Sequence, residues 1–227
     1  MKKSILLTGA ILLFNVVLFA QDCVFYYPKT EGKQLEYTSF DAKDKKTGSS
    51  IQRVKETSEN EGILSVLVET QSFDKKGKDI GTNEYTAKCE NGVYTVDMKS
   101  FMDAATMASY EDQDIEVSGN NLEIPANLNV GDELPNGRLS ISIYSNGTRI
   151  MGMSTVLTKR KVEAKEEITT EAGTFECYKI TYTMTVSTMF SVRMEAADWI
   201  CEDVGTVKSE TYSRGKTMGY TLLTGIK

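Results

Sequence analysis

The sequence predicts a mostly β protein: a single antiparallel sheet, strongly curved into a barrel or roll, with one short helix packed against it. Three observations favour this fold. Many short segments rich in Thr, Val, Ile, Tyr and Phe alternate between apolar and polar residues, and glycine-containing turns separate them. A third is their number, because about a dozen strands cannot stay one flat open sheet without curling or splitting.

The amino terminus is typical of a secretory signal. Lys2 and Lys3 precede an apolar run over residues 5–19, and Ala20 follows it. This run is shorter than the roughly 20 apolar residues of a stable membrane span. We therefore expect cleavage after Ala20, which leaves residues 21–227 as one antiparallel β domain. Bulky Gln21 and charged Asp22 before Cys23 argue against a lipoprotein cut.

Removal of residues 1–20 takes away two lysines and leaves 24 basic against 32 acidic residues, a net charge of −8. This balance opposes nucleic acid as a partner, because nucleic-acid binding needs a basic surface. Nothing after residue 20 resembles a second apolar span, so we expect no integral membrane span in the mature chain. The predicted location is the bacterial periplasm or cell envelope, or the extracellular space.

Turn signals place the strands in order. Asn91-Gly92 and Asn146-Gly147 predict type I′ hairpins, and Gly119-Asn120 predicts a third tight turn. An aromatic strand end before a polar, glycine-containing loop recurs at residues 39–48, 73–78 and 212–216. The candidate strands are residues 34–40, 63–68, 80–89, 93–98, 115–117, 122–124, 139–144, 149–157, 161–169, 175–186, 191–201, 204–213 and 217–223.

One segment departs from the β pattern. Ser100 to Asp103 fits a helix-capping signal, and residues 101–110 contain apolar residues at helical spacing. Acidic residues after position 110 oppose the helix dipole and should end the helix. We expect this short helix to lie against the sheet and to line a ligand cavity. The candidate ligand-binding residues are Phe101, Met102, Ala105 and Met107.

The mature chain contains nine methionines, whose unbranched thioethers form adaptable apolar walls. Ordinary core packing, an apolar ligand cavity and a Cu(I) site are the three interpretations. A copper site would need a tight cluster, and only Met151 and Met153 are close in sequence. No metal ligands and no cofactor are therefore predicted.

Four cysteines in an exported chain suggest up to two disulfides. If residues 175–186 and 191–201 form a hairpin that turns near Met189, Cys177 lies opposite Cys201, close enough for a bridge. Cys23 would then pair with Cys89 and tie the mature amino terminus to the sheet. Free buried thiols are the alternative.

The chain has no histidine, which excludes Ser-His-Asp and Cys-His catalysis from its own side chains. Acidic residues gather around Trp199 (Glu195, Asp198, Glu202, Asp203) and again at Glu111, Asp112, Asp114 and Glu116. A carboxylate pair across a groove is what glycoside hydrolysis requires, but a solvated face is the better explanation of both groups. No catalytic residue is predicted, and whether the protein is an enzyme stays open.

Several short phrases together resemble the TapB-like family of exported bacterial domains of unknown function. They are Tyr26-Tyr27-Pro28, Glu31-Gly32, Glu36-Tyr37, Ile124-Pro125, Val130-Gly131-Asp132, Leu134, Ala172-Gly173-Thr174-Phe175, Lys179-Ile180 and Val204-Gly205-Thr206-Val207-Lys208. The resemblance implies a single curved β domain in the bacterial envelope and supplies no catalytic residues.

Three functional hypotheses follow. The first is a non-catalytic envelope protein that binds an apolar or amphipathic ligand, such as a lipid or another apolar small molecule. The second is an interaction or assembly module that contacts another envelope protein through an exposed apolar patch. The third is a hydrolase built on two carboxylates. A cavity favours the first, an exposed patch the second and a close acid pair the third.

Overall fold

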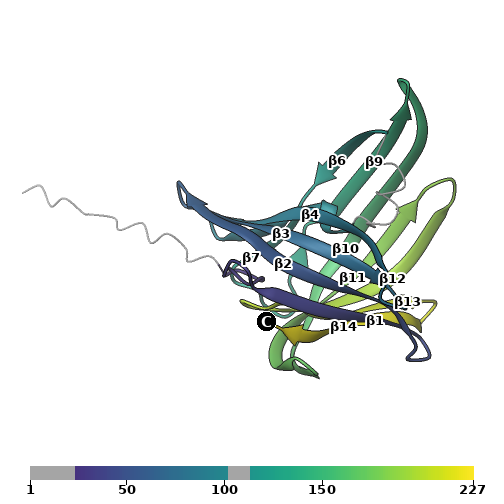
Figure 1. The fold of residues 1–227 in the computed structure, drawn as a ribbon. Coiled ribbons are helices and arrows are strands. Elements are labelled where there is room, and N and C mark those ends of the chain that lie inside the picture. The colour runs from purple at the N-terminus through teal and green to yellow at the C-terminus, as the bar shows by residue number, and fades with distance from the viewer. Residues whose placement is uncertain (1–23, 102–112) are drawn as a thin grey trace, which may run out of the picture.

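The computed structural model describes residues 24–101 and 113–227, which form one antiparallel sheet of 14 strands (Figure 1). The strands are β1 (Gln34–Asp41), β2 (Lys46–Asn60), β3 (Ile63–Asp74), β4 (Asp79–Glu90), β5 (Val93–Val96), β6 (Asp114–Asn120), β7 (Leu122–Pro125), β8 (Glu133–Leu134), β9 (Gly137–Ser145), β10 (Thr148–Thr170), β11 (Gly173–Ser187), β12 (Ser191–Cys201), β13 (Gly205–Ser213) and β14 (Lys216–Ile226).

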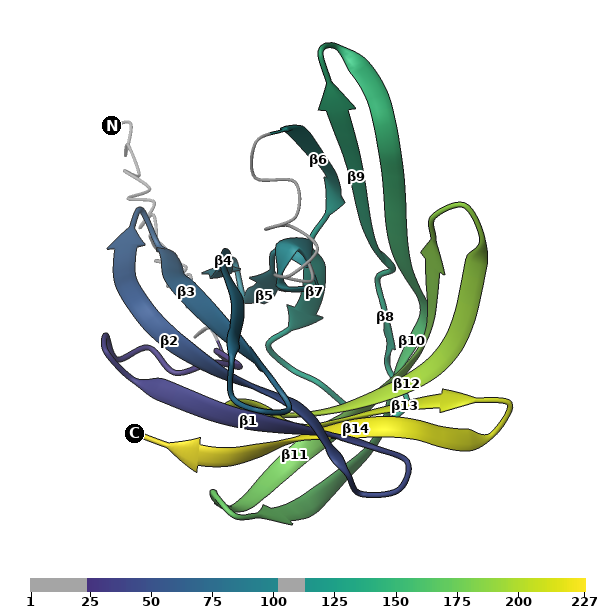
Figure 2. The same cartoon turned by 45° about the vertical axis from the view of Figure 1, so that its right-hand side comes forward.

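The order of strands in the sheet explains its curvature. It runs β6-β9-β10-β11-β12-β13-β14-β1-β2-β3-β4-β5-β7, and β8 pairs with β10 off this path. The first strand thus pairs with the last, from Leu35 opposite Ile226 onward. Strands β6 and β7 lie at opposite ends of the order, yet Asn121 alone separates them in sequence. The sheet must therefore curl until its ends approach, and Figures 1 and 2 show a nearly closed barrel.

The predicted mostly β, strongly curved antiparallel fold is confirmed, with three differences in the strands. The two-residue strand β8 was not predicted. Strand β2 was missed because 14 of its 15 residues are not buried, Val54 being the exception, so its sequence lacks apolar alternation. The two predicted strands at 149–157 and 161–169 are the single 23-residue strand β10. A bulge at Lys159, whose φ is 54°, interrupts its pairing with β11 and made it look like two strands.

Two of the three predicted hairpin turns are confirmed. Asn91-Gly92 joins β4 to β5 and Asn146-Gly147 joins β9 to β10, and all four residues have the positive φ of a type I′ turn. The turn predicted at Gly119-Asn120 is wrong, because both residues belong to β6 and pair with β9. Glycine is needed at this position because β6 and β9 approach closely: a Cβ on Gly119 would lie 1.9 Å from the Arg138 carbonyl oxygen.

The predicted helix is not found in the described part of the chain. Met98–Phe101 forms a single 3-10 turn, η1, and the rest of the predicted helix, including Met102, Ala105 and Met107, lies outside the described residues. The same ranges, 24–101 and 113–227, contain no helix long and apolar enough to cross a membrane.

Buried aromatic side chains lie on both faces of the sheet. Inside the barrel, the segment before β1 packs Phe25 edge-to-face on Tyr94 at 4.9 Å, and Tyr26 contacts the same ring at 5.7 Å. On the outer face of β12, Trp199 is 4% exposed, and its indole Nε1 donates to Glu166 of β10 at 2.5 Å. The far half of β10 therefore reaches the outer face of the sheet at Trp199, whose ring also lies beneath the ammonium groups of Lys179 and Lys208.

The first disulfide prediction is confirmed. Cys177 and Cys201 are bonded, with Cα atoms 4.5 Å apart, because the β11–β12 hairpin has the register that the sequence suggested. Cys89 is also disulfide-bonded. Its predicted partner, Cys23, lies outside the described residues, so that pairing stays a prediction.

Candidate ligand-binding pocket

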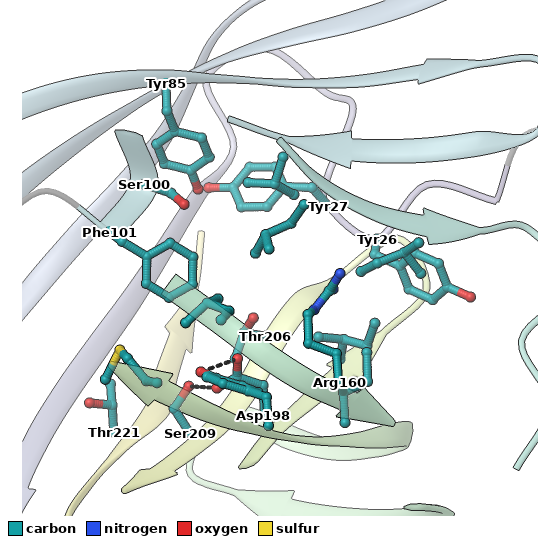
Figure 3. Close-up of a pocket in the computed structure, with 18 of the residues that line it drawn as sticks. Tyr26, Tyr27, Tyr85, Ser100, Phe101, Arg160, Asp198, Thr206, Ser209 and Thr221 are labelled. Carbon is teal, nitrogen blue, oxygen red and sulfur yellow. Dashed lines mark hydrogen bonds between the residues drawn. The ribbon is translucent and has the colours of Figure 1, made fainter. Parts of the chain in front are cut away.

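A pocket of about 390 Å³ opens inside the curved sheet. Its walls come from the barrel strands, from η1 and from the segment before β1, and Figure 3 shows how their side chains converge. The lining residues are Tyr26, Tyr27, Tyr37, Ser50, Gln52, Tyr85, Tyr94, Val96, Ser100, Phe101, Leu122, Ile124, Leu157, Arg160, Ile180, Tyr182, Met184, Asp198, Ile200, Thr206, Ser209, Glu210, Thr211 and Thr221.

Phenol rings dominate one side of this pocket. Tyr27 and Tyr85 both donate to the side-chain oxygen of Gln52, at 3.1 and 3.4 Å, and Tyr94 donates to the backbone oxygen of Tyr26 at 3.3 Å. Burial raises the pKa of Tyr27, Tyr85 and Tyr94. These phenols therefore stay neutral and offer large apolar ring faces with their polar ends already bonded.

The opposite wall carries a polar cluster centred on Asp198 of β12. Its carboxylate accepts a hydrogen bond from Tyr182 at 2.9 Å and another from Ser209 at 2.6 Å. Strand pairing sets this geometry, because Ser209 lies directly opposite Asp198 in β13. Tyr182 of β11 lies diagonally across from it. The dashed lines in Figure 3 mark these two bonds.

Arg160 brings a positive charge into the same pocket. The bulge at Lys159 adds one residue to the strand, so Leu157 and Arg160 both point inward instead of to opposite faces. One nitrogen of the guanidinium, Nη1, donates to the backbone oxygens of Glu123 at 3.2 Å and Pro135 at 2.6 Å. Arg160 is 4% exposed, which is rare for an arginine.

Burial shifts the pKa values of both charged groups. Loss of hydration raises the pKa of Asp198 above its ordinary value, although its two hydroxyl donors and the nearby Arg160 oppose that rise. Loss of hydration also lowers the pKa of Arg160, and the negative charge of Asp198 opposes this. The pocket thus holds two opposite charges within a mainly apolar and phenolic wall.

The pocket presents one carboxylate from β12 and β13 rather than a pair. Glu210 lines the pocket through its strand, but its side chain bonds to Lys208 and Tyr212, which alternate with the inward Ser209 and Thr211. A hydrolase of the kind considered above needs two acids facing each other across the groove. Glu210 points to the other face and cannot be the second acid.

The remaining acidic residues of the two predicted groups are surface groups where they are described. Glu195 and Glu202 are exposed, and Asp203 forms an ion pair with Lys29 at 2.7 Å. Asp114 and Glu116 are exposed on β6, while Glu111 and Asp112 lie outside the described residues. No group of three or more potential metal ligands gathers within the described ranges.

Of the four predicted ligand-binding residues, the structure describes Phe101, which lines the pocket from η1. Met102, Ala105 and Met107 lie outside the described residues. Among the methionines, Met184 lines the pocket and Met98 is buried, whereas Met189 and Met218 are exposed.

Sequence reasoning missed the tyrosines, Arg160 and Ser209 as pocket residues. It placed Asp198 in an acidic group but did not separate it from its solvated neighbours. The one available signal was the apolar context of Asp198, since Ala196, Ala197, Trp199 and Ile200 surround it.

Comparisons with known proteins agree with the fold. The model of the DUF3108-like family matches residues 30–223. A protein from Bacteroides fragilis NCTC 9343, provisionally described as exported and YmcC-like in fold, is 24% identical with a TM-score of 0.76; the match covers 90% of this chain and all of that one. A provisionally described lipoprotein from Parabacteroides distasonis ATCC 8503 is 23% identical with a TM-score of 0.78, over 91% of this chain and all of that one. No curated protein matches the chain.

Proposed function

The chain belongs to the DUF3108-like family, and we propose that it is an exported cell-envelope protein that binds an apolar or amphipathic ligand inside its curved sheet. The pocket of about 390 Å³ is the observation that carries this proposal. Its volume lies within the range of about 300–1,000 Å³ that is common for small-molecule sites. In a protein that binds no ligand, side chains would normally fill an interior space of this volume.

The chemistry of the lining supports an amphipathic ligand. Tyrosine rings and aliphatic side chains such as Leu157 and Ile180 suit an apolar body. The cluster of Asp198, Tyr182 and Ser209, with Arg160 nearby, suits a polar end. Ligand sites commonly combine mainly apolar walls with a few converging polar groups.

Export is supported by the signal-like residues 1–20 and by the Cys177–Cys201 disulfide, because disulfides persist in oxidising compartments. The two solved structures of the same fold are themselves described as exported and as a lipoprotein. We further propose that the chain groups with the TapB-like proteins within this fold, on the phrases quoted above.

A pocket-filling variant tests ligand binding. Met184→Trp adds an indole to the pocket wall, and Met218→Trp makes the same change at a side chain that is 57% exposed and outside the pocket. The probe is N-phenyl-1-naphthylamine, a neutral dye whose fluorescence rises in apolar surroundings. We expect wild type and Met218→Trp to bind it equally and Met184→Trp to bind it about tenfold more weakly.

Thermal unfolding monitored by circular dichroism checks that both variants fold. Dye binding that is absent in the folded wild type, or equally strong in folded Met184→Trp, would contradict the proposed site. Native mass spectrometry of protein purified from the periplasm then shows whether a small molecule occupies it.

A second candidate function, contact with another envelope protein, has one specific observation in its favour. The tip of the β11–β12 hairpin exposes Met189 at 90% and Phe190 at 79%, with Val192 beside them at 56%. Large apolar side chains so exposed often mark interaction sites. A photo-crosslinker at position 190 should yield one defined protein adduct, whereas a crosslinker at exposed Lys216 should not.

A further inference from the structure

Arg160 is placed in the pocket by the backbone, not by an ion pair. The bulge at Lys159 turns it inward, and the carbonyl oxygens of Glu123 and Pro135 hold Nη1. No ion pair within 4.0 Å joins it to Asp198 or to any other acid of residues 24–101 and 113–227. A buried cation without a direct countercharge is costly and asks for a reason.

The guanidinium also has hydrogen-bonding capacity to spare. Arginine carries five N–H donors, and Nη1 accounts for two of them. Neither Nε nor Nη2 donates to any described residue. No described side chain contains a fully buried nitrogen or oxygen without a partner, so Nε and Nη2 must border open space. Because Arg160 is 4% exposed and lines the pocket, that open space is the pocket.

We propose that the amphipathic ligand carries one negative charge, a carboxylate, that pairs with Nε and Nη2 of Arg160. This proposal rests on the ligand-binding function proposed above. Nε and Nη2 form the side of a guanidinium that meets a carboxylate with two parallel hydrogen bonds. Such a ligand would place a countercharge in direct contact with Arg160, which no described acid does. In Figure 3, Arg160 rises from the wall of Asp198 into the space below Tyr26 and Tyr27.

Asp198 narrows the class of ligand further. Its carboxylate is held by Tyr182 and Ser209 and is close enough to Arg160 for their charges to interact. It therefore repels any anionic head group, and a dianion more strongly than a monoanion, which favours a carboxylate over a phosphate dianion. The apolar lining and the volume of about 390 Å³ suit a single alkyl chain behind that head group.

Displacement of N-phenyl-1-naphthylamine by three single-chain amphiphiles tests the charge of the head group. The competitors are decanoate, methyl decanoate and decyltrimethylammonium at pH 7.5, all below the concentration at which they form micelles. We expect decanoate to displace the dye from wild type at a concentration about tenfold lower than methyl decanoate, and the cation to compete worst.

Variants assign that preference to Arg160. Arg160→Gln should bring decanoate and methyl decanoate to equal potency, and Arg193→Gln, at an exposed arginine outside the pocket, should leave the preference intact. Asp198→Asn should increase the preference for decanoate, since it removes the competing negative charge. If Arg160→Gln does not fold, Arg160→Lys serves instead and should retain a smaller preference for decanoate.

The outcomes separate this proposal from the function on which it rests. Equal displacement of the dye by decanoate and its methyl ester in wild type, or stronger displacement by the cation, overturns the carboxylate assignment and leaves ligand binding standing. A preference for decanoate that persists unchanged in Arg160→Gln also overturns it. Absence of dye binding altogether overturns both.

Discussion

Single residues with unusual backbone or surroundings define the pocket. Lys159 has a left-handed φ of 54°, and the bulge that it makes decides that Arg160, rather than Lys161, points inward. Asp198 is the counterpart on β12, a carboxylate flanked by buried apolar residues. Both depart from the ordinary rules of a half-buried strand, and such departures often accompany function.

At the residue scale, Asp198→Asn should change how stability depends on pH. The native pKa of Asp198 lies above the ordinary 3.8, so between these two values the native state holds a proton that the unfolded state has lost. Stability from this group is therefore present at low pH and is lost as pH rises through that window. The free energy of unfolding of Asp198→Asn minus that of wild type should increase with pH.

Urea denaturation of both proteins at a series of pH values measures this difference. All other titrating groups contribute almost equally to the two proteins and cancel in the subtraction. A difference that falls as pH rises would contradict the prediction.

A shared loop device recurs at the ends of two hairpins. Asp41 accepts backbone hydrogen bonds from Lys43 and Lys45, and Asp74 accepts the equivalent pair from Lys76 and Lys78. These bonds lower the pKa of both aspartates. The recurring phrase in the sequence thus has a local physical cause at two of its three sites.

At the scale of elements, strand β6 depends on a glycine. A Cβ on Gly119 would lie 1.9 Å from the Arg138 carbonyl oxygen of β9, and its φ of 151° is unfavourable for other residues. Gly119→Ala should therefore separate the two strands locally and cost about 2 kcal/mol or more of unfolding free energy.

Gly147→Ala is the matched control. Gly147 also has positive φ, 75°, but nothing lies within 4 Å of the added Cβ. Gly147→Ala should therefore lower the unfolding free energy only by the backbone penalty of about 1 kcal/mol. Chemical denaturation measures both, and equal losses in the two variants would contradict the steric explanation.

The Cys177–Cys201 bridge strengthens the β11–β12 hairpin that carries Tyr182 and Asp198. The bonded residues are 24 apart in sequence. Loss of the crosslink should therefore increase the conformational entropy of the unfolded chain and lower the unfolding free energy by about 3 kcal/mol. The double variant Cys177→Ala/Cys201→Ala should lose stability of that order in denaturant unfolding. A double variant as stable as the oxidised wild type would contradict this expectation.

At the scale of the whole molecule, the closure of the sheet creates the pocket. Residues from both halves of the chain line it, from Tyr26 to Thr221, so neither half alone forms the complete site. The pairing of β1 with β14 joins these halves. Ligand binding should therefore stabilise the entire barrel in one cooperative transition, because the ligand binds only the closed state.

The second prediction for the whole molecule concerns cleavage of the amino-terminal signal after Ala20. When the full chain is expressed in bacteria, the purified periplasmic protein should begin at Gln21. Intact-mass spectrometry distinguishes this product from the two alternatives. A mass that includes residues 1–20 contradicts cleavage, and a mass with a lipid on Cys23 contradicts the predicted cleavage site in favour of a lipoprotein.

Local patterns were sufficient to predict most of the fold. Alternation gave most strands, Asn-Gly pairs gave two hairpins, and the symmetry of the β11–β12 hairpin gave a disulfide. Prediction failed where local chemistry is ambiguous. Strand β2 has almost no buried residues, and Gly119 serves strand contact rather than a turn.

The sequence alone thus determined a mostly β chain, curved and crosslinked, because periodicity, turn residues and hairpin register are local properties. It identified Phe101 as a candidate ligand-binding residue but not the pocket residues around it. Only the tertiary structure decided the pocket itself, with Arg160 and Asp198 inside it. Those positions depend on bulges that shift strand phase and on the pairing of strands far apart in the chain, neither of which local sequence encodes.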